Sequence, residues 1–274
     1  MKLTTVLTII SLLGLLIIGI GCLGVQANGS SLNTNSPSKY SMHENQQLNY
    51  EIAILSKDRS TNVLKDLKMH VDKVDSENIS ETFVITVANS LENRFAIKMT
   101  NRGNILESNS KKPIIPEVQP ELPNLLEFPE KSTNSGTHWT KEFNQSGNYL
   151  TSNGTIEYYL TGNSDFTNIG RKKITTMAGT FDCIGIKHVT DYLIKESLIS
   201  ENGTSNSEKY GNFNGENWID PRNGILIESA FDSHKVISVD LSETTKGAFG
   251  FEKMYREVPV DFHMTTKLTN ISNI

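Results

Sequence analysis

The chain has 274 residues, with 26 Lys or Arg against 31 Asp or Glu, and therefore a formal net charge of −5. A negative net charge without a basic stripe argues against nucleic acid as a partner. Only two cysteines are present, Cys22 and Cys183. If Cys22 is lipidated or removed, Cys183 has no partner for an internal disulfide, so we expect a hydrophobic core to hold the domain.

Residues 1–25 predict a signal peptide or a membrane anchor. Lys2 precedes an uncharged apolar run over residues 6–25, which is the charge order of an export signal. The run is also close to the roughly 20 residues that span a bilayer. Cys22 follows Gly21 as in a bacterial lipobox, although Gly19 stands where a leucine-like residue is usual. Lipidation at Cys22, a single-span anchor, and cleavage with secretion stay open. All three place the rest of the chain outside the cytoplasm. The remaining interpretation of Cys22 is a cysteine that simply lies within an apolar helix.

Residues 26–46 are predicted to be a polar flexible tether, because Asn, Ser, Thr and Gly dominate its first half. Acceptor sequons for N-glycosylation also recur along the chain. Many arise by chance in an Asn-rich sequence, and their use requires glycosylation machinery. They lie at Asn28, Asn78, Asn144, Asn153, Asn202 and Asn270.

Residues 47–274 predict a β-rich extracytoplasmic domain, since apolar and polar residues alternate with a period of two in many short segments. No long amphipathic helix follows the signal. Before the proline-rich segment, strands are expected at 48–56, 67–72, 82–88, 95–99 and 105–106. After it, they are expected at 137–143, 155–160, 166–176, 180–192, 217–219, 225–227, 236–241 and 254–268.

Residues 111–131 form a proline-rich connector that contains five of the eight prolines. Proline lacks the N–H that a strand ladder needs, so we expect an extended segment with one short helical turn at Leu125 and Leu126. The connector either separates two domains or carries the chain across the outside of one sheet. We favour the second, because neither half has many strands of its own. The predicted fold is therefore mostly β: a single antiparallel, strongly curved sheet or half-open barrel after an N-terminal apolar signal or anchor helix.

Three motifs in residues 130–245 resemble segments of exported envelope proteins. Residues 136–139 read Gly-Thr-His-Trp, residues 178–183 read Ala-Gly-Thr-Phe-Asp-Cys, and Trp218 precedes a Gly-Ile-Leu hairpin at residues 224–226. Their order and spacing are similar to TapB-like and related domains of unknown function. These are distantly similar to Lol-type lipoprotein carriers, whose half-open barrels hold acyl chains. The resemblance implies a fold and a location, and it carries no catalytic residues.

The sequence offers little catalytic chemistry. Gly19, Gly21 and Gly24 match a dinucleotide pattern, but they end an export segment and not a strand. His43 and Glu44 begin a zinc-protease pattern that fails at Gln47. The six histidines are scattered, so we predict no metal and no cofactor. Glu142, Glu157, Asp182 and Asp191 are the acids that would have to pair in a hydrolase.

The sequence thus favours a membrane-anchored envelope protein, lipid-anchored or single-span, that binds a lipid or hydrophobic small molecule or acts as a scaffold. Secretion is the alternative location. The alternative functions are a hydrolase of surface glycan or peptide with paired carboxylates and a purely structural envelope component. A curved sheet leaves a concave apolar face on which ligands bind. The candidate lining residues are Phe95, Ile97, Trp139, Tyr158, Phe181 and Trp218.

Overall fold

The computed structural model describes residues 36–57, 62–87, 91–110, 112–120, 122–131, 133–201, 203–240 and 255–273. The predicted signal or anchor at 1–25, Cys22, and the sequons at Asn28 and Asn202 lie outside the described residues. In the described ranges, no helix is both long enough and apolar enough to cross a membrane.

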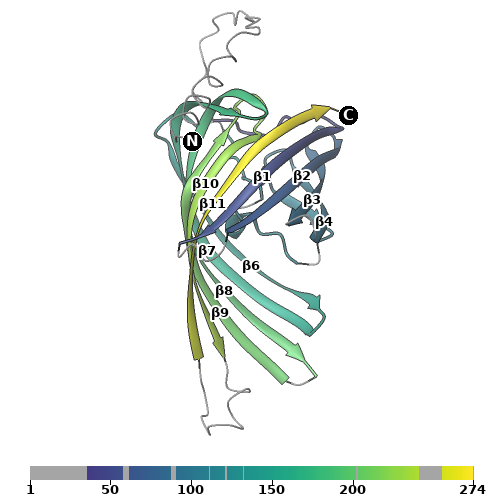
Figure 1. The fold of residues 1–274 in the computed structure, drawn as a ribbon, viewed down its shortest axis with the longest axis vertical. Helices are drawn as coiled ribbons and strands as arrows, with labels where there is room; N and C mark the ends of the chain where they lie inside the picture. The colour runs from purple at the N-terminus through teal and green to yellow at the C-terminus, as the bar shows by residue number, and fades with distance from the viewer. Residues whose placement is uncertain are drawn as a thin grey trace, which may run out of the picture. The chain divides into compact units, whose positions relative to one another are not determined.

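The described strands form one antiparallel sheet of eleven strands that is not closed (Figure 1). The order is β5-β4-β3-β2-β1-β11-β10-β9-β8-β7-β6. The first and last strands pair in the middle of the sheet, so β5 and β6 form its two edges. The strands are β1 Gln46–Ser56, β2 Asn62–Val74, β3 Asn78–Val87, β4 Leu91–Thr100, β5 Ile105–Ser108, β6 His138–Thr151, β7 Gly154–Thr176, β8 Gly179–Ser200, β9 Gly203–Ile219, β10 Leu226–Asp240 and β11 Tyr255–Asn273. The prediction of a mostly β, single antiparallel sheet is confirmed.

Several strands are longer than the sequence pattern predicts. Residues 155–160 and 166–176 belong to the single strand β7, and β8 and β9 also include residues 193–200 and 203–216. Most of these added residues are Ser, Asn, Glu, Lys and Gly, so the apolar alternation that identifies a strand is missing. Backbone pairing continues to the hairpin nevertheless, ending with Ser200 opposite Gly203.

Glycines that lie opposite aromatic rings let the sheet curl. Phe143, Gly162, Tyr192 and Gly211 are successive cross-strand partners from β6 to β9. A Cβ atom on Gly162 would come within 2.3 Å of the Phe143 ring, and one on Gly211 within 2.3 Å of the Tyr192 ring. Each ring therefore lies over a strand that has no side chain at that point, which permits strong local curvature.

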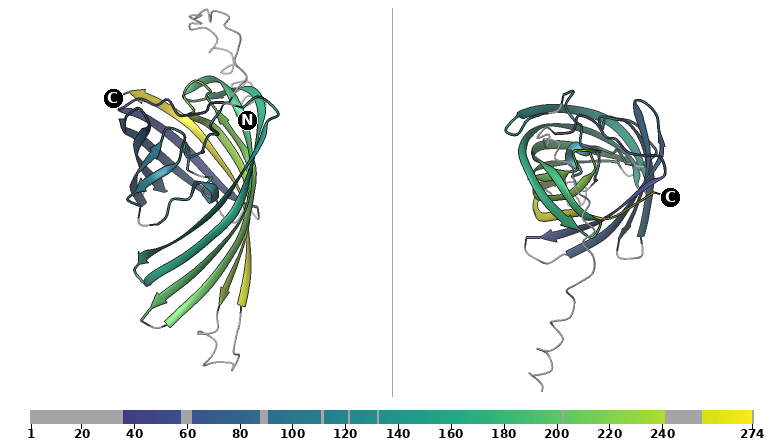
Figure 2. Two further views of the ribbon diagram at one scale, coloured as in Figure 1. Left: turned by 180° about the vertical axis from the view of Figure 1, so that it is seen from behind. Right: turned by 90° about the horizontal axis from the view of Figure 1, so that it is seen from above.

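The proline-rich connector lies inside the curved sheet, not across its outside. Its residues Ile115, Val118, Leu125 and Phe128 are buried in the same core as the strands, and Figure 2 shows the sheet wrapped around this segment when seen from above. The expectation of an outer connector is wrong because the apolar residues between its prolines need cover, while prolines themselves need no N–H partner. Its helical turn is the 3-10 helix η1 at Pro116–Val118, not Leu125 and Leu126.

The end of the predicted tether is also packed. Tyr40 and Met42 are buried, and the Tyr40 hydroxyl donates to the carbonyl oxygen of Leu126 in the connector over 2.9 Å. The Ser41 N–H donates to the carbonyl oxygen of Asn223 over 2.9 Å. The flexible tether expected over 26–46 therefore does not extend through residues 40–42, because the side chains of Tyr40 and Met42 pack in the core.

Candidate binding groove on the inner face of the sheet

A groove lies on the inner face of the sheet, where β6 to β10 extend past the connector. Its volume is about 400 Å³, which falls in the range of roughly 300–1,000 Å³ typical of small-molecule sites. Strand residues form its floor and walls, and the start of the connector forms one end. The lining residues are Lys112, Pro113, Ile115, Val118, Gln119, Tyr149, Tyr158, Tyr192, Ile194, Glu196, Lys209 and Lys235.

Three tyrosines give the groove most of its aromatic surface. Tyr149 and Tyr158 come from β6 and β7, and their ring centroids are 6.3 Å apart with a tilt of 51°. Tyr158 lies directly opposite Gly147, so its ring has room over the neighbouring strand. Tyr192 covers Gly211 in the same way. The glycine pairing thus sets the positions of two rings in the groove.

Glu196 organises the polar wall. Its carboxylate forms an ion pair with Lys209 and accepts hydrogen bonds from the Tyr149 hydroxyl at 3.4 Å and the Ser207 hydroxyl at 3.5 Å. Burial, followed by the negative charge of Glu196, raises the pKa of Tyr149 above its ordinary value. Tyr149 therefore stays a neutral donor at neutral pH.

The groove continues into an open mouth of about 790 Å³ at the sheet edge, between the end of β5 and the β6–β7 hairpin. The two spaces share Lys112, Pro113, Tyr149 and Tyr158. The mouth has fewer charged lining residues than the groove. Its other described lining residues are Ser108, Ser110, Gly147, Asn148, Leu150, Thr151 and Ser152.

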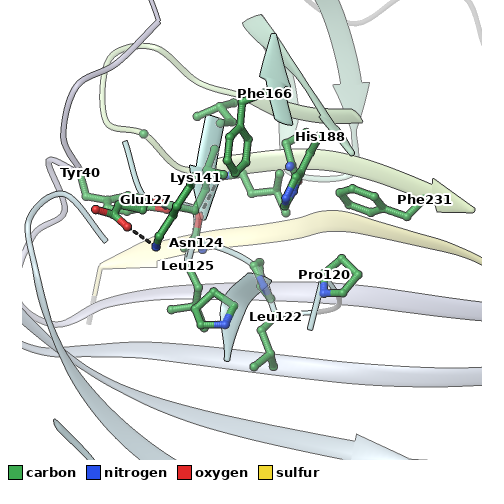
Figure 3. Close-up of a pocket in the computed structure, with 17 residues that line it drawn as sticks. Tyr40, Pro120, Leu122, Asn124, Leu125, Glu127, Lys141, Phe166, His188 and Phe231 are labelled. Carbon is green, nitrogen blue, oxygen red and sulfur yellow. Dashed lines mark hydrogen bonds and ion pairs between the residues drawn. The ribbon is translucent and has the colours of Figure 1, made fainter. Parts of the chain in front are cut away.

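A second, much smaller cavity lies between the connector and a row of aromatic rings (Figure 3). In this row Trp139 stacks on Phe166 at 5.4 Å, Phe166 on His188 at 4.3 Å, and His188 meets Phe231 edge-on at 6.0 Å. The cavity measures about 50 Å³. That volume suits a few water molecules, whereas a benzene-sized ligand occupies a cavity of about 150 Å³.

The polar groups around this small cavity are consistent with water. Asn217 is buried and lines the cavity. Lys141 and Glu127 form an ion pair beside it (Figure 3). Burial lowers the pKa of His188 to about 3, so its ring is neutral. The cavity therefore suits water molecules beside buried polar groups, and it does not fit a lipid or drug-sized molecule.

Of the predicted lining residues, Tyr158 alone lines the groove. Phe95 and Ile97 are buried in β4, with Phe95 stacked on Phe83 at 5.1 Å. Trp139 belongs to the aromatic row, and Phe181 is a core residue. The Trp218 indole N–H donates to Glu216 over 3.1 Å and its ring lies 5.1 Å from Lys172 Nζ. The structure thus does not bring the six residues together.

The groove residues that were not predicted are Tyr149, Tyr192, Lys209 and those of the connector. One signal was available: Gly147 on β6, Gly162 on β7 and Gly211 on β9 each lie opposite an aromatic residue. Of the sequons that the structure describes, Asn144, Asn153 and Asn270 are exposed, whereas Asn78 is half-buried.

The acidic residues considered for hydrolysis lie apart from both spaces. Glu142, Glu157, Asp182 and Asp191 are all exposed, and none lines the groove or the small cavity. Across the described ranges, no three His, Cys, Asp or Glu side chains gather as metal ligands would. Cys183 is fully buried in the core, and burial raises the pKa of its thiol to about 12.

No protein-family model matches the chain, and no curated protein sequence matches it either. Two solved structures align with most of the chain. A protein from Bacteroides fragilis, provisionally described as exported and with a YmcC-like fold, is 11% identical, with 86% of this chain and 99% of that chain covered and a TM-score of 0.36. A protein from Parabacteroides distasonis, provisionally described as a lipoprotein, is 13% identical, with 87% and 99% covered and a TM-score of 0.36. At these values neither likeness transfers a function, ligand or location to this chain.

Proposed function

We propose that the chain is a non-catalytic binding protein that holds a hydrophobic ligand in the inner-face groove. The observation that carries the proposal is the groove of about 400 Å³, with Tyr149, Tyr158 and Tyr192 beside Ile115, Val118 and Ile194. Apolar and aromatic walls with a few polar groups are typical of small-molecule sites. The exposed position of the candidate acids gives the hydrolase reading no comparable support.

The proposed place of action is outside the cytoplasm, at the membrane. The apolar run in residues 6–25 and Cys22 support this location, as does the resemblance of residues 130–245 to exported envelope proteins. Recovery of the native protein in the membrane fraction tests it, and a wholly cytoplasmic, soluble native protein would contradict it.

Two neighbouring tyrosines on opposite faces of β7 provide the test of binding. Tyr158 lines the groove, whereas Tyr159 is 41% exposed and lines neither space. Titration of the full-length chain with a fluorescent fatty-acid analogue should show saturable binding. Tyr158→Ala should weaken it roughly tenfold, through loss of about 1–1.5 kcal/mol of aromatic contact.

Tyr159→Ala serves as the matched control and should bind like the wild type. Thermal unfolding of both variants checks that the fold is kept. Absence of saturable binding by a folded wild-type sample would refute the proposal, and so would equal losses in the two variants.

A further inference from the structure

The mouth of the groove differs from the groove in its chemistry. Among the described residues that line it, Lys112 carries the single charge, and no acidic side chain is present. The chain as a whole carries a net charge of −5. A locally cationic mouth on an acidic protein is therefore a local feature and not a reflection of overall composition.

Two serine hydroxyls that line the mouth with Lys112 accept backbone N–H groups and keep their own protons to donate. The Ser108 hydroxyl oxygen accepts the N–H of Ser110 at 3.1 Å, and the Ser110 hydroxyl oxygen accepts the N–H of Lys112 at 3.3 Å. Neither hydroxyl proton has an acceptor among the described residues. Since each hydroxyl holds one proton to donate, both O–H groups and the Lys112 ammonium group are available to an acceptor that a ligand supplies.

Lys112 also joins the two spaces, because it lines both the mouth and the tyrosine groove. A ligand with a hydrocarbon chain in the groove would thus place its polar end beside Lys112, Ser108 and Ser110. The groove volume of about 400 Å³ is near the lower end of ligand-sized pockets, which favours one chain over two.

We propose that the ligand is a single-chain amphiphile whose anionic head, a carboxylate or a phosphate, binds at Lys112, Ser108 and Ser110. This inference rests on the proposed function, since the groove must hold the chain. Ion–ammonium and ion–hydroxyl hydrogen bonds are stronger than neutral ones, so the head group determines the preference among ligands with equal chains. Glu196 lies in the groove and outside the mouth, paired with Lys209.

Competition against a bound fluorescent fatty-acid analogue on the full-length chain tests the inference. The competitors are a long-chain fatty acid, the alcohol of the same length and a single-chain lysophospholipid whose head group is a phosphate. At least one anion should compete better than the alcohol, and Lys112→Gln should weaken that anion roughly three- to tenfold while leaving the alcohol unchanged. The better competitor of the two anions identifies the head group.

Lys195→Gln is the matched control, because Lys195 is paired with Glu208 at 3.2 Å and lines neither space. Equal competition by all three ligands, or no effect of Lys112→Gln, would overturn the anionic head and leave the hydrophobic groove standing. Failure of every competitor, together with no saturable binding of the analogue, would instead refute the proposed function.

Discussion

Glu81 is a carboxylic acid enclosed by apolar side chains. It is fully buried on β3 between its cross-strand partners Val71 and Ile97, and neither carboxyl oxygen has a hydrogen-bond partner. The nearby hydroxyls of Tyr40 and Tyr50 already donate to backbone carbonyl oxygens. Burial, followed by repulsion from Asp72, raises the pKa of Glu81 from its ordinary value of 4.5 to about 8.

This raised pKa makes stability depend on pH. The folded protein holds the Glu81 proton more tightly than the unfolded chain does. The contribution of protonated Glu81 to the free energy of unfolding is therefore full below pH 4.5 and is lost as the pH rises through about 8. Glu81→Met removes the titration and fills a similar volume with apolar atoms. Its free energy of unfolding should exceed that of the wild type by roughly 2–4 kcal/mol near pH 8.

Urea unfolding from about pH 5 to about pH 9 measures the difference. The gap between variant and wild type should widen as the pH rises. Glu107→Met on the exposed strand β5 is the control and should show no such trend. A gap that stays constant or narrows with rising pH would contradict the buried, protonated state of Glu81.

Gly211 leaves space for an aromatic ring on the neighbouring strand. Gly211→Ala would place a methyl group 2.3 Å from the Tyr192 ring. We expect a loss of roughly 1–3 kcal/mol in the free energy of unfolding. The loss should shrink in a Tyr192→Leu background, because the clashing ring is gone. A double-mutant cycle measures this coupling, and strictly additive losses would show that the ring does not need the glycine.

Among the elements, the connector differs most from the sequence-based expectation. Asn124 fixes it in the core: its amide nitrogen donates to the Tyr50 hydroxyl over 2.7 Å, and its side-chain oxygen accepts the N–H of Leu226 over 2.8 Å. One side chain thereby joins the connector to β1 and β10. Its φ of 61° is the left-handed conformation that Asn tolerates better than most residues.

Asn124→Gly and Asn124→Ala separate the amide from the backbone. Glycine keeps the positive φ freely but loses the side-chain hydrogen bonds, so it should cost roughly 2–4 kcal/mol of unfolding free energy. Alanine should cost more, because it also strains the backbone. Chymotrypsin should spare Leu125 and Phe128 in the wild type and cut there sooner in both variants. Early cutting of folded wild-type protein would contradict the packed connector.

The strands that the sequence predicted best are those with one buried face. Leu48, Tyr50 and Ile52 alternate with half-buried neighbours and define β1. The distal parts of β8 and β9 were not predictable in this way, since Lys, Glu and Ser occupy both faces and pairing alone extends the strands. The groove was missed because Lys209 lies in that region, and because the connector residues meet it and Tyr192 only after folding.

At the scale of the whole sheet, the groove opens at the gap between the two edge strands. Because β5 and β6 do not pair, the connector crosses between them, and the mouth lies at that gap. The inner face is filled by the connector over one part of the sheet and left accessible where β6 to β10 extend beyond it. The fold thus combines a packed core with a ligand-sized groove.

Photoaffinity labelling with a photoreactive fatty acid tests the central claim most directly, because it maps where a hydrophobic ligand sits on the full-length chain. We expect labelled peptides from the tyrosine segments of β6 and β7 and from residues 112–119, with labelling suppressed by an excess of unlabelled fatty acid. Labelling confined to exposed outer-face residues such as Tyr159, or labelling that unlabelled ligand does not suppress, would contradict a binding groove on the inner face.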